Sequence, residues 1–204
     1  MITVVGMGPG SPDYLPPVAR EAVERADMLV GSAGRLALFA GHPGRKIDFH
    51  PLDKALDAIK AFAGAGNIAV LVSGDPGLYS LLPAVQRAVP GVEIKVVPGI
   101  SCAQVLFARL GLDWSNVTFV SLHGRGTEPL RSLLGPGRRL CVFTDKDNGP
   151  SQIGRILGAG GLSGRAVIGE DLTGVDEKVI ETDFGGLIKH EGSSACIVYL
   201  EIAQ

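Results

Sequence analysis

The stretch NIAVLVSGDPGLY, residues 67–79, contains the pattern that decides the fold. Its first half, residues 67–73, is a continuous apolar run rich in β-branched side chains, which is typical of a strand buried on both faces. Glycine and proline follow at once in GDPGLY, so the chain leaves the strand through a tight turn. A buried strand that runs into a glycine loop predicts a parallel sheet whose carboxyl edge presents backbone to a ligand.

The same strand-to-loop pattern recurs on both sides of this stretch. Residues 2–5 form a short β-branched run that enters GMGPGS at 6–11, and residues 93–97 form a run that enters PGIS at 98–101. Residues 27–30 form a further strand that ends at Gly31. These runs predict neighbouring strands whose loops leave the sheet on one side.

Helical segments separate the predicted strands. Pro16 and Pro17 suit the first turn of a helix. The spacing predicts its apolar face at Val18, Ala22 and Ala26. A second apolar face is formed by Leu52, Leu56, Ile59 and Phe62. A third helix begins at Ser101, where Gln104 completes a capping box. Alternating strands and helices predict an α/β fold in which helices cover a mostly parallel sheet.

The second half of the chain has more strands than helices. LGLDWSN at 110–116 breaks the rhythm, and we place a linker at about 112–116, between an N-terminal α/β domain of residues 1–111 and a C-terminal α/β domain of residues 117–204. The expected strands are 117–122, 139–144, 165–169, 178–182 and 195–202. Short helices are expected at about 128–134, 152–157 and 184–190. This imbalance favours a mixed sheet with antiparallel pairs.

Composition excludes several functions. The net charge of −2, from 19 basic and 21 acidic residues, gives no basic excess for binding nucleic acid. We expect no signal peptide and no membrane span, because the apolar runs are short and no basic segment precedes the first one. The three cysteines, Cys102, Cys141 and Cys196, have apolar neighbours, which favours buried free thiols in a reducing cytoplasm over a metal or redox site.

A dinucleotide-binding fold is the obvious competitor. GMGPGS partly matches G-x-G-x-x-G, but Ser11 stands where the third glycine should be. The second strand ends at Gly31 and Ser32 instead of at an acid that would hold a ribose. The chain also has no G-x-x-x-x-G-K-[ST] loop. Hydride transfer and phosphoryl transfer are therefore disfavoured.

Four motifs in this order, GMGPG, SGDPGLY, PGIS and SLHGR, resemble the tetrapyrrole methylase family. Within that family, LGLDWSNVTFVSLHGR at 110–125 is most similar to the enzymes that methylate C5 of precorrin-7 or cobalt-precorrin-7. The resemblance implies two α/β domains with the cofactor in the cleft between them. It also implies S-adenosyl-L-methionine as the methyl donor, S-adenosyl-L-homocysteine as the product, no metal and a homodimer. A functional partner would supply methylation and decarboxylation at C15.

The resemblance also assigns site residues. It implies cofactor contacts at Pro9, Gly74, Asp75, Leu78, Ser101, Cys102, Phe143, Thr144 and Glu170. The segment VIGEDLTGVDEKVIETD at 167–183 resembles the family's acidic-leucine segment and the strand that follows it. Two positions depart from the family pattern: Cys102 replaces a serine found in many relatives, and FTD at 143–145 replaces a tyrosine–methionine pair. A backbone contact is therefore expected at Cys102.

Several of these residues have a second interpretation. Asp75 can accept hydrogen bonds from the cofactor, or it can cap a helix that follows Pro76. Ser101 can cap its own helix while free N–H groups at the helix start face the cofactor. Pro9 suits a simple turn as well as it suits a cleft.

His123 and Arg125 are the candidate substrate-binding pair, because they occupy a glycine-flanked loop after a strand. Corrin precursors carry many carboxylates, which arginine binds in a bidentate manner. Candidate arginines are Arg35, Arg45, Arg125, Arg131 and Arg138, and of these we predict Arg125. The proton released after methyl transfer could go to His123, to Asp75 or to substrate nitrogens, and the sequence does not choose among them.

Two other functions remain open. The same fold could methylate another precorrin carbon, a modified histidine on a protein, or ribosomal RNA, although the near-neutral charge disfavours RNA. The chain could also be a non-catalytic module that binds a cofactor or a partner. Methyl transfer itself demands little of the protein beyond aligning the reactants and excluding water.

Overall fold

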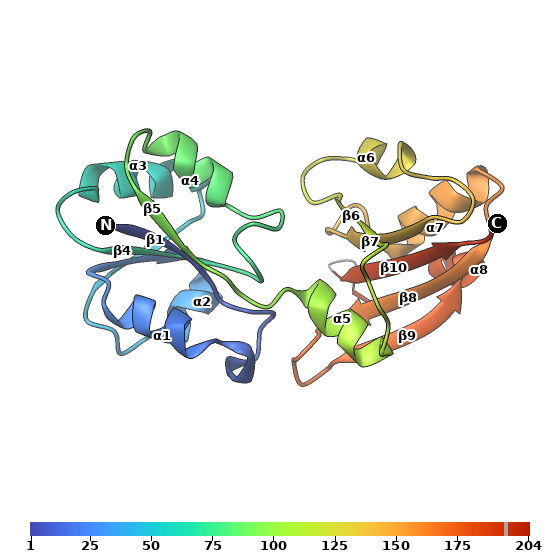
Figure 1. Cartoon of the computed structure of the whole chain (residues 1–204), viewed down its shortest axis with the longest axis horizontal. Coiled ribbons are helices and arrows are strands. Elements are labelled where there is room, and N and C mark those ends of the chain that lie inside the picture. Colours follow the sequence, from blue (N-terminus) through green and yellow to red (C-terminus); the bar gives the residue numbers. More distant parts are fainter. Residues whose placement is uncertain (194–195) are drawn as a thin grey trace. The chain divides into compact units, whose positions relative to one another are not determined.

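The computed structural model describes residues 1–193 and 196–204 and shows two compact units, Met1–Ser101 and Cys102–Gln204 (Figure 1). This division falls before the expected linker at 112–116. The reason is that helix α5 (Cys102–Leu110) packs on the second sheet, where the Phe107 ring lies 5.2 Å from Tyr199 and 6.5 Å from Phe119. Trp114 also stacks on Phe107 at 6.4 Å, so the expected linker packs on the second unit.

The first unit contains a parallel sheet, as the sequence predicted. Its strands are β1 (Ile2–Gly6), β2 (Met28–Gly31), β3 (Arg45–Asp48), β4 (Ile68–Val72) and β5 (Ile94–Val97), in the order β3-β2-β4-β1-β5. Strands β1, β2 and β4 are buried along their whole length, which explains their continuous apolar runs.

Helices cover both faces of this sheet. A short 3-10 helix, η1 (Pro12–Tyr14), precedes α1 (Pro17–Glu24), which lies with α2 (Ala33–Ala37) on one face (Figure 1). Helices α3 (Leu52–Phe62) and α4 (Leu82–Ala88) lie on the opposite face. Strand β3 and helices α2 and α4, which are four, five and seven residues long, were not predicted, because so short a segment shows no clear periodicity.

The apolar face predicted for α1 is partly wrong. Val18 is 52% exposed, whereas Ala19 and Val23 are buried against the sheet. Ala26 is buried as predicted, and Ala22 is partly buried. The helix is therefore rotated by about one residue relative to the prediction, because alanines on several faces made the 3.6-residue pattern ambiguous.

The second unit contains the predicted mixed sheet. Its strands are β6 (Thr118–Ser121), β7 (Arg139–Phe143), β8 (Gly164–Glu170), β9 (Lys178–Asp183) and β10 (Ile197–Ile202), in the order β6-β7-β10-β8-β9. β6 pairs with β7 in parallel, and the other pairs are antiparallel. The last strand was expected from residue 195; Ser194 and Ala195 lie outside the described residues.

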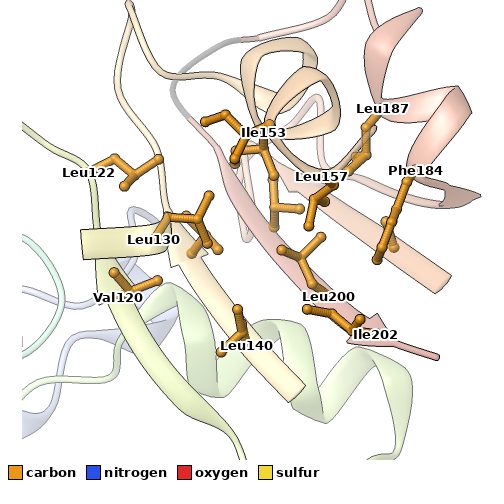
Figure 2. Close-up of a cluster of buried hydrophobic side chains, with 14 of the residues drawn as sticks. Val120, Leu122, Leu130, Leu140, Ile153, Leu157, Phe184, Leu187, Leu200 and Ile202 are labelled. Atoms are coloured by element: carbon orange, nitrogen blue, oxygen red, sulfur yellow. The ribbon is translucent and has the colours of Figure 1, made fainter. Parts of the chain in front are cut away.

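Three helices pack on one face of this second sheet: α6 (Glu128–Arg131), α7 (Pro150–Ala159) and α8 (Phe184–Ile188). Figure 2 shows Ile153 and Leu157 of α7 in a cluster with Leu187 of α8 and Leu200 of β10. Helix α5 covers the other face. No helix in the described part of the chain has the length and apolar character needed to cross a membrane.

Candidate functional site

Three glycine loops of the first unit meet at the carboxyl edge of its sheet. Register pairs Gly6 with Val72 and Val5 with Val97, so β1, β4 and β5 end side by side. Beyond the strands, the Gly74 N–H donates to the Gly8 carbonyl at 2.9 Å. The loops at 6–11, 73–79 and 98–101 therefore form one cluster, as expected for neighbouring parallel strands.

Glycine in this cluster allows backbone to pack on backbone. A Cβ atom at Gly99 would lie 2.2 Å from the Gly74 carbonyl oxygen, and one at Gly6 would lie 2.5 Å from the Gly99 nitrogen. Gly74 also has a φ of +59°, which favours glycine. At Gly6 and Gly99, contact between the loops is therefore by itself enough to require glycine.

Asp75 ties two of these loops together. Its Oδ1 accepts a hydrogen bond from the Gly77 N–H at 2.7 Å, and its Oδ2 accepts one from the Gly99 N–H at 3.1 Å. The alternative that Asp75 caps a helix is wrong, because the next helix, α4, begins only at Leu82. Each carboxylate oxygen can still accept a further hydrogen bond, so this half-buried group remains able to bind a ligand.

The other predicted cofactor residues of the first unit belong to the same cluster. Pro9 lies half-buried in the first loop, and Leu78 lies half-buried in the second. Ser101 is buried, and its Cα lies 3.4 Å from the position that a Cβ would take at Gly74. Sequence motifs that are far apart along the chain thus form one surface.

The second unit also brings its predicted residues to one edge. β7 and β8 both pair antiparallel with β10, and β6 runs parallel to β7, so β6, β7 and β8 share a direction. Ser121 pairs with Phe143, and both Phe143 and Gly169 pair with Ile197. The loop at 121–126, Thr144 and Glu170 therefore all leave the sheet at the same edge.

His123 and Arg125 are exposed on the loop at 121–126. The backbone of this loop is held by Asp145, which our sequence reasoning did not single out. The buried Asp145 accepts the Gly124 N–H on Oδ2 at 3.0 Å, and on Oδ1 it accepts the Asp147 and Asn148 N–H groups at 2.9 and 2.8 Å. Asp145, just after a strand and followed by KDNGP at 146–150, is a turn signal that could have revealed this role.

The electrostatics of Asp145 follow from these contacts. Burial acts to raise the pKa of Asp145, but the N–H groups of Gly124, Asn148 and Asp147 stabilise the carboxylate and lower the pKa below its ordinary value. Asp145 therefore remains ionised at neutral pH and keeps the His123–Arg125 loop attached to the end of β7.

Two predicted cofactor residues are already engaged within the second unit. The Thr144 hydroxyl donates to the Cys196 carbonyl at 2.6 Å and accepts the Cys196 N–H at 2.7 Å. The buried Glu170 carboxylate lies 2.9 Å from Nε2 of His190, another residue that we did not predict. Phe143 is half-buried at the end of β7. The side chains of Thr144 and Glu170 thus have structural roles here.

The cysteines are free thiols; Cys141 is buried as predicted, and Cys102 and Cys196 are half-buried. Burial raises the pKa of both Cys102 and Cys196 to about 11, and it raises the pKa of Cys141 well above the ordinary value. A thiol with such a pKa stays protonated at neutral pH and is a poor nucleophile. Cys102, the first residue of α5, can therefore offer a ligand its backbone or a neutral side chain.

A parallel sheet with converging glycine loops, followed by a mixed sheet with its own loop edge, is the two-unit α/β architecture that the sequence predicted. The family model for tetrapyrrole (corrin/porphyrin) methylases matches residues 1–188, and the chain belongs to this family. It is therefore a methyltransferase, and its four loop motifs are those by which the sequence resembles this family.

Individual relatives show which members of the family this chain resembles. The chain is 34% identical to the cobalt-precorrin-7 C(5)-methyltransferase of Salmonella typhimurium, over 88% of this chain and 89% of that one. It is 29% identical to the decarboxylating precorrin-6Y C(5,15)-methyltransferase of a Sinorhizobium species, over 87% of this chain but only 44% of that one. The crystal structure of the cobalamin-biosynthesis precorrin-6Y methylase from Archaeoglobus fulgidus is 26% identical with a TM-score of 0.75, and the match covers 100% of this chain and 98% of that one.

Proposed function

We propose that this chain transfers a methyl group from S-adenosylmethionine to C5 of precorrin-7 or its cobalt form in vitamin B12 biosynthesis. The observation that carries the proposal is the cluster of the three loops around Asp75, in a chain that aligns along most of its length with a C5-methyltransferase. The names of the other two relatives, both precorrin-6Y methylases, point to the same class of substrate.

The first-unit cluster has suitable groups for this cofactor. When bound, S-adenosylmethionine supplies a methyl group that is activated by a positively charged sulfonium. Asp75 offers a negative charge and spare acceptor capacity to its amino or hydroxyl groups. Pro9, Gly74, Leu78 and Ser101 line the same cluster. Tight glycine turns let a ligand approach the backbone closely, for example at the exposed Gly77.

Residues of the second unit complete the proposed set. We assign cofactor contacts to Cys102, Phe143, Thr144 and Glu170. The hydroxyl of Thr144 and the carboxylate of Glu170 already have partners, so backbone contacts are favoured at these two positions. The exposed His123 and Arg125 are assigned to the substrate, and His123 is the proposed acceptor of the proton released from the ring carbon after methylation.

The proposal includes two partners. We propose a homodimer, which light scattering would detect as twice the chain mass of 21.2 kDa. We also propose that a functional partner supplies the C15 methylation and decarboxylation, since the Sinorhizobium relative, whose name includes both activities, is more than twice as long as the region that aligns.

The direct test is an assay with labelled S-adenosylmethionine and a panel of precorrin intermediates. We expect the label on precorrin-7 or cobalt-precorrin-7, attached to C5 as located by carbon-13 NMR. Labelling of RNA or of a protein without labelling of any tetrapyrrole would contradict the proposal. A folded chain that binds neither S-adenosylmethionine nor S-adenosylhomocysteine in calorimetry would instead support a non-catalytic module.

A further inference from the structure

The candidate arginines differ in whether they lie near the amino ends or the carboxyl ends of the strands. Arg45 begins β3 and Arg138 precedes β7, so both lie at the amino ends of their strands, away from the loop clusters. Arg131 lies on α6, 3.7 Å from the carboxylate of Glu128. Arg125 is exposed on its loop. Arg35 differs from all four in its placement and its surroundings.

Arg35 lies beside the first-unit loop cluster. Helix α2, which carries it, begins directly after the carboxyl end of β2. Strand β2 is the neighbour of β4, and a Cβ atom at Gly31 would lie 3.1 Å from the Cβ of Leu71. Strand β4 continues into the loop that contains Asp75. Ser32 and Arg35 therefore leave the same edge of the sheet as that loop, one strand further out.

The guanidinium of Arg35 is half-buried and has no acidic partner. Its Nη1 donates to the Ser32 hydroxyl at 2.9 Å, and no carboxylate among residues 1–193 and 196–204 forms an ion pair with it. Burial lowers the pKa of Arg35, although arginine stays charged at any physiological pH. By contrast, Arg109 and Arg165 lie 2.6 Å from Glu177 and 3.0 Å from Glu181. A positive charge partly removed from water without a counterion favours the binding of an anion.

We infer that Arg35 and Ser32 form a carboxylate-binding pair that holds a side-chain carboxylate of the tetrapyrrole substrate; this rests on the proposed function. The planar guanidinium suits a carboxylate, and the Ser32 hydroxyl, which does not cap α2, can donate to the same anion. The proposed cofactor groups Asp75 and Gly99 follow β4 and β5, whereas Arg35 follows β2, which neighbours β4 on the side away from β1 and β5. A large ring with many carboxylates reaches this outer position more readily than the cofactor does.

Arg35 could instead bind the carboxylate of S-adenosylmethionine. Two binding measurements distinguish this cofactor carboxylate from a carboxylate of the ring. Calorimetry with cobyrinic acid, a stable corrin polycarboxylate, reports on the ring, and calorimetry with S-adenosylhomocysteine reports on the cofactor. We expect Arg35→Gln to weaken cobyrinic acid binding by about tenfold or more and to leave S-adenosylhomocysteine binding unchanged. Ser32→Ala should weaken cobyrinic acid binding in the same direction by a smaller factor.

Arg45→Gln is the matched control, because it removes the same charge from an exposed position at the opposite edge of the same sheet. It should change neither binding constant. If the wild type binds both ligands and Arg35→Gln binds cobyrinic acid normally, the Arg35 inference is wrong and the proposed function stands. If Arg35→Gln loses S-adenosylhomocysteine instead, the pair serves the cofactor and the inference is also overturned.

A wild type that binds neither ligand would refute the proposed function, and the inference would fail with it. Melting temperatures of the variants show whether each one folds. Ser32→Ala removes only a hydroxyl from a half-buried residue, so it keeps the test decisive if Arg35→Gln does not fold.

Discussion

In each unit, an aspartate that follows a strand holds a loop in place by accepting backbone N–H groups. Asp75 follows β4 and fixes the loops of the first unit, and Asp145 follows β7 and fixes the loop of His123 and Arg125. Each accepts N–H groups that no strand can satisfy, because the backbone has turned away from the sheet. A loop held in this way presents its outer surface in one geometry, which lowers the entropic cost of binding a ligand.

Asp75→Ala should weaken the binding of S-adenosylhomocysteine by about tenfold or more, because the variant loses both the ligand acceptor and the link to Gly99. Calorimetry measures the change. Asp57→Ala, which removes an exposed carboxylate paired with Lys60 on α3, is the control and should bind normally. An unchanged affinity in folded Asp75→Ala protein would show that the loop does not bind the cofactor.

Asp145→Asn tests the electrostatics of the second loop. The pKa of Asp145 is lowered in the folded chain, so its carboxylate contributes stability above its unfolded pKa of about 3.9, and that stability is lost as pH falls through the folded value. Asp145→Asn lacks this contribution. The difference in free energy of unfolding between wild type and variant should therefore be largest near pH 7 and shrink below about pH 4.

Denaturant unfolding at several pH values gives that difference. Asp147→Asn, at an exposed position in the same turn, should show a smaller difference at neutral pH. A difference between wild type and Asp145→Asn that stays constant down to pH 3 would mean that the N–H groups do not stabilise the charge.

At the scale of elements, the loop cluster depends on how closely three strand ends approach. Gly99→Ala would place a Cβ atom 2.2 Å from the Gly74 carbonyl oxygen, so the two loops must move apart. We expect this variant to lose about 2 kcal/mol or more of stability and to bind S-adenosylhomocysteine more weakly. Thermal unfolding and calorimetry measure the two effects.

Gly41→Ala is the control for this variant, since nothing lies within 4 Å of the position that its Cβ would take. It should leave both stability and binding nearly unchanged. If Gly99→Ala behaved like Gly41→Ala, the loops could adapt without cost, and close packing would not explain the glycines.

Strands with a continuous apolar run were predicted well, whereas β3 was missed. Strands β1 and β4 are buried on both faces, so their sequences alone identify them. Strand β3 is an edge strand with the sequence RKID, which contains no apolar run that would predict a strand. Its pairing with β2 supplies the hydrogen bonds that define it, and such pairing cannot be read from four residues.

For the whole molecule, a ligand that binds only the folded state must stabilise it. At a concentration of one hundred times its dissociation constant, S-adenosylhomocysteine should add about 2.7 kcal/mol to the free energy of unfolding. A thermal melt should show this as a shift of a few degrees for a chain of 204 residues. Asp75→Ala should shift less at the same ligand concentration, and no shift in the wild type at any concentration would contradict cofactor binding.

The division of the chain shows the limit of reading organisation along a sequence. The irregular segment at 112–116 suggested a linker, yet Trp114 and Phe107 stack in the second unit, which begins at Cys102. An aromatic side chain in a polar segment gives no sign of the ring that it will contact. Boundaries depend on such long-range packing, so the predicted domain limits of 111 and 117 were set too late.

Local pattern was enough for the α/β class, the parallel and mixed sheets, the glycine loops and the family, because each depends on periodicity or on a motif within a few residues. Local pattern could not predict contacts between residues that are far apart in the sequence. These are Asp75 with Gly99, Asp145 with Gly124, and Glu170 with His190. Nor could it predict that Arg35 bonds to Ser32 and has no acidic partner. These depend on strand order and register, which bring distant residues within hydrogen-bonding distance. A side chain's charge is visible in the sequence, but whether that charge is paired is decided only when the chain has folded.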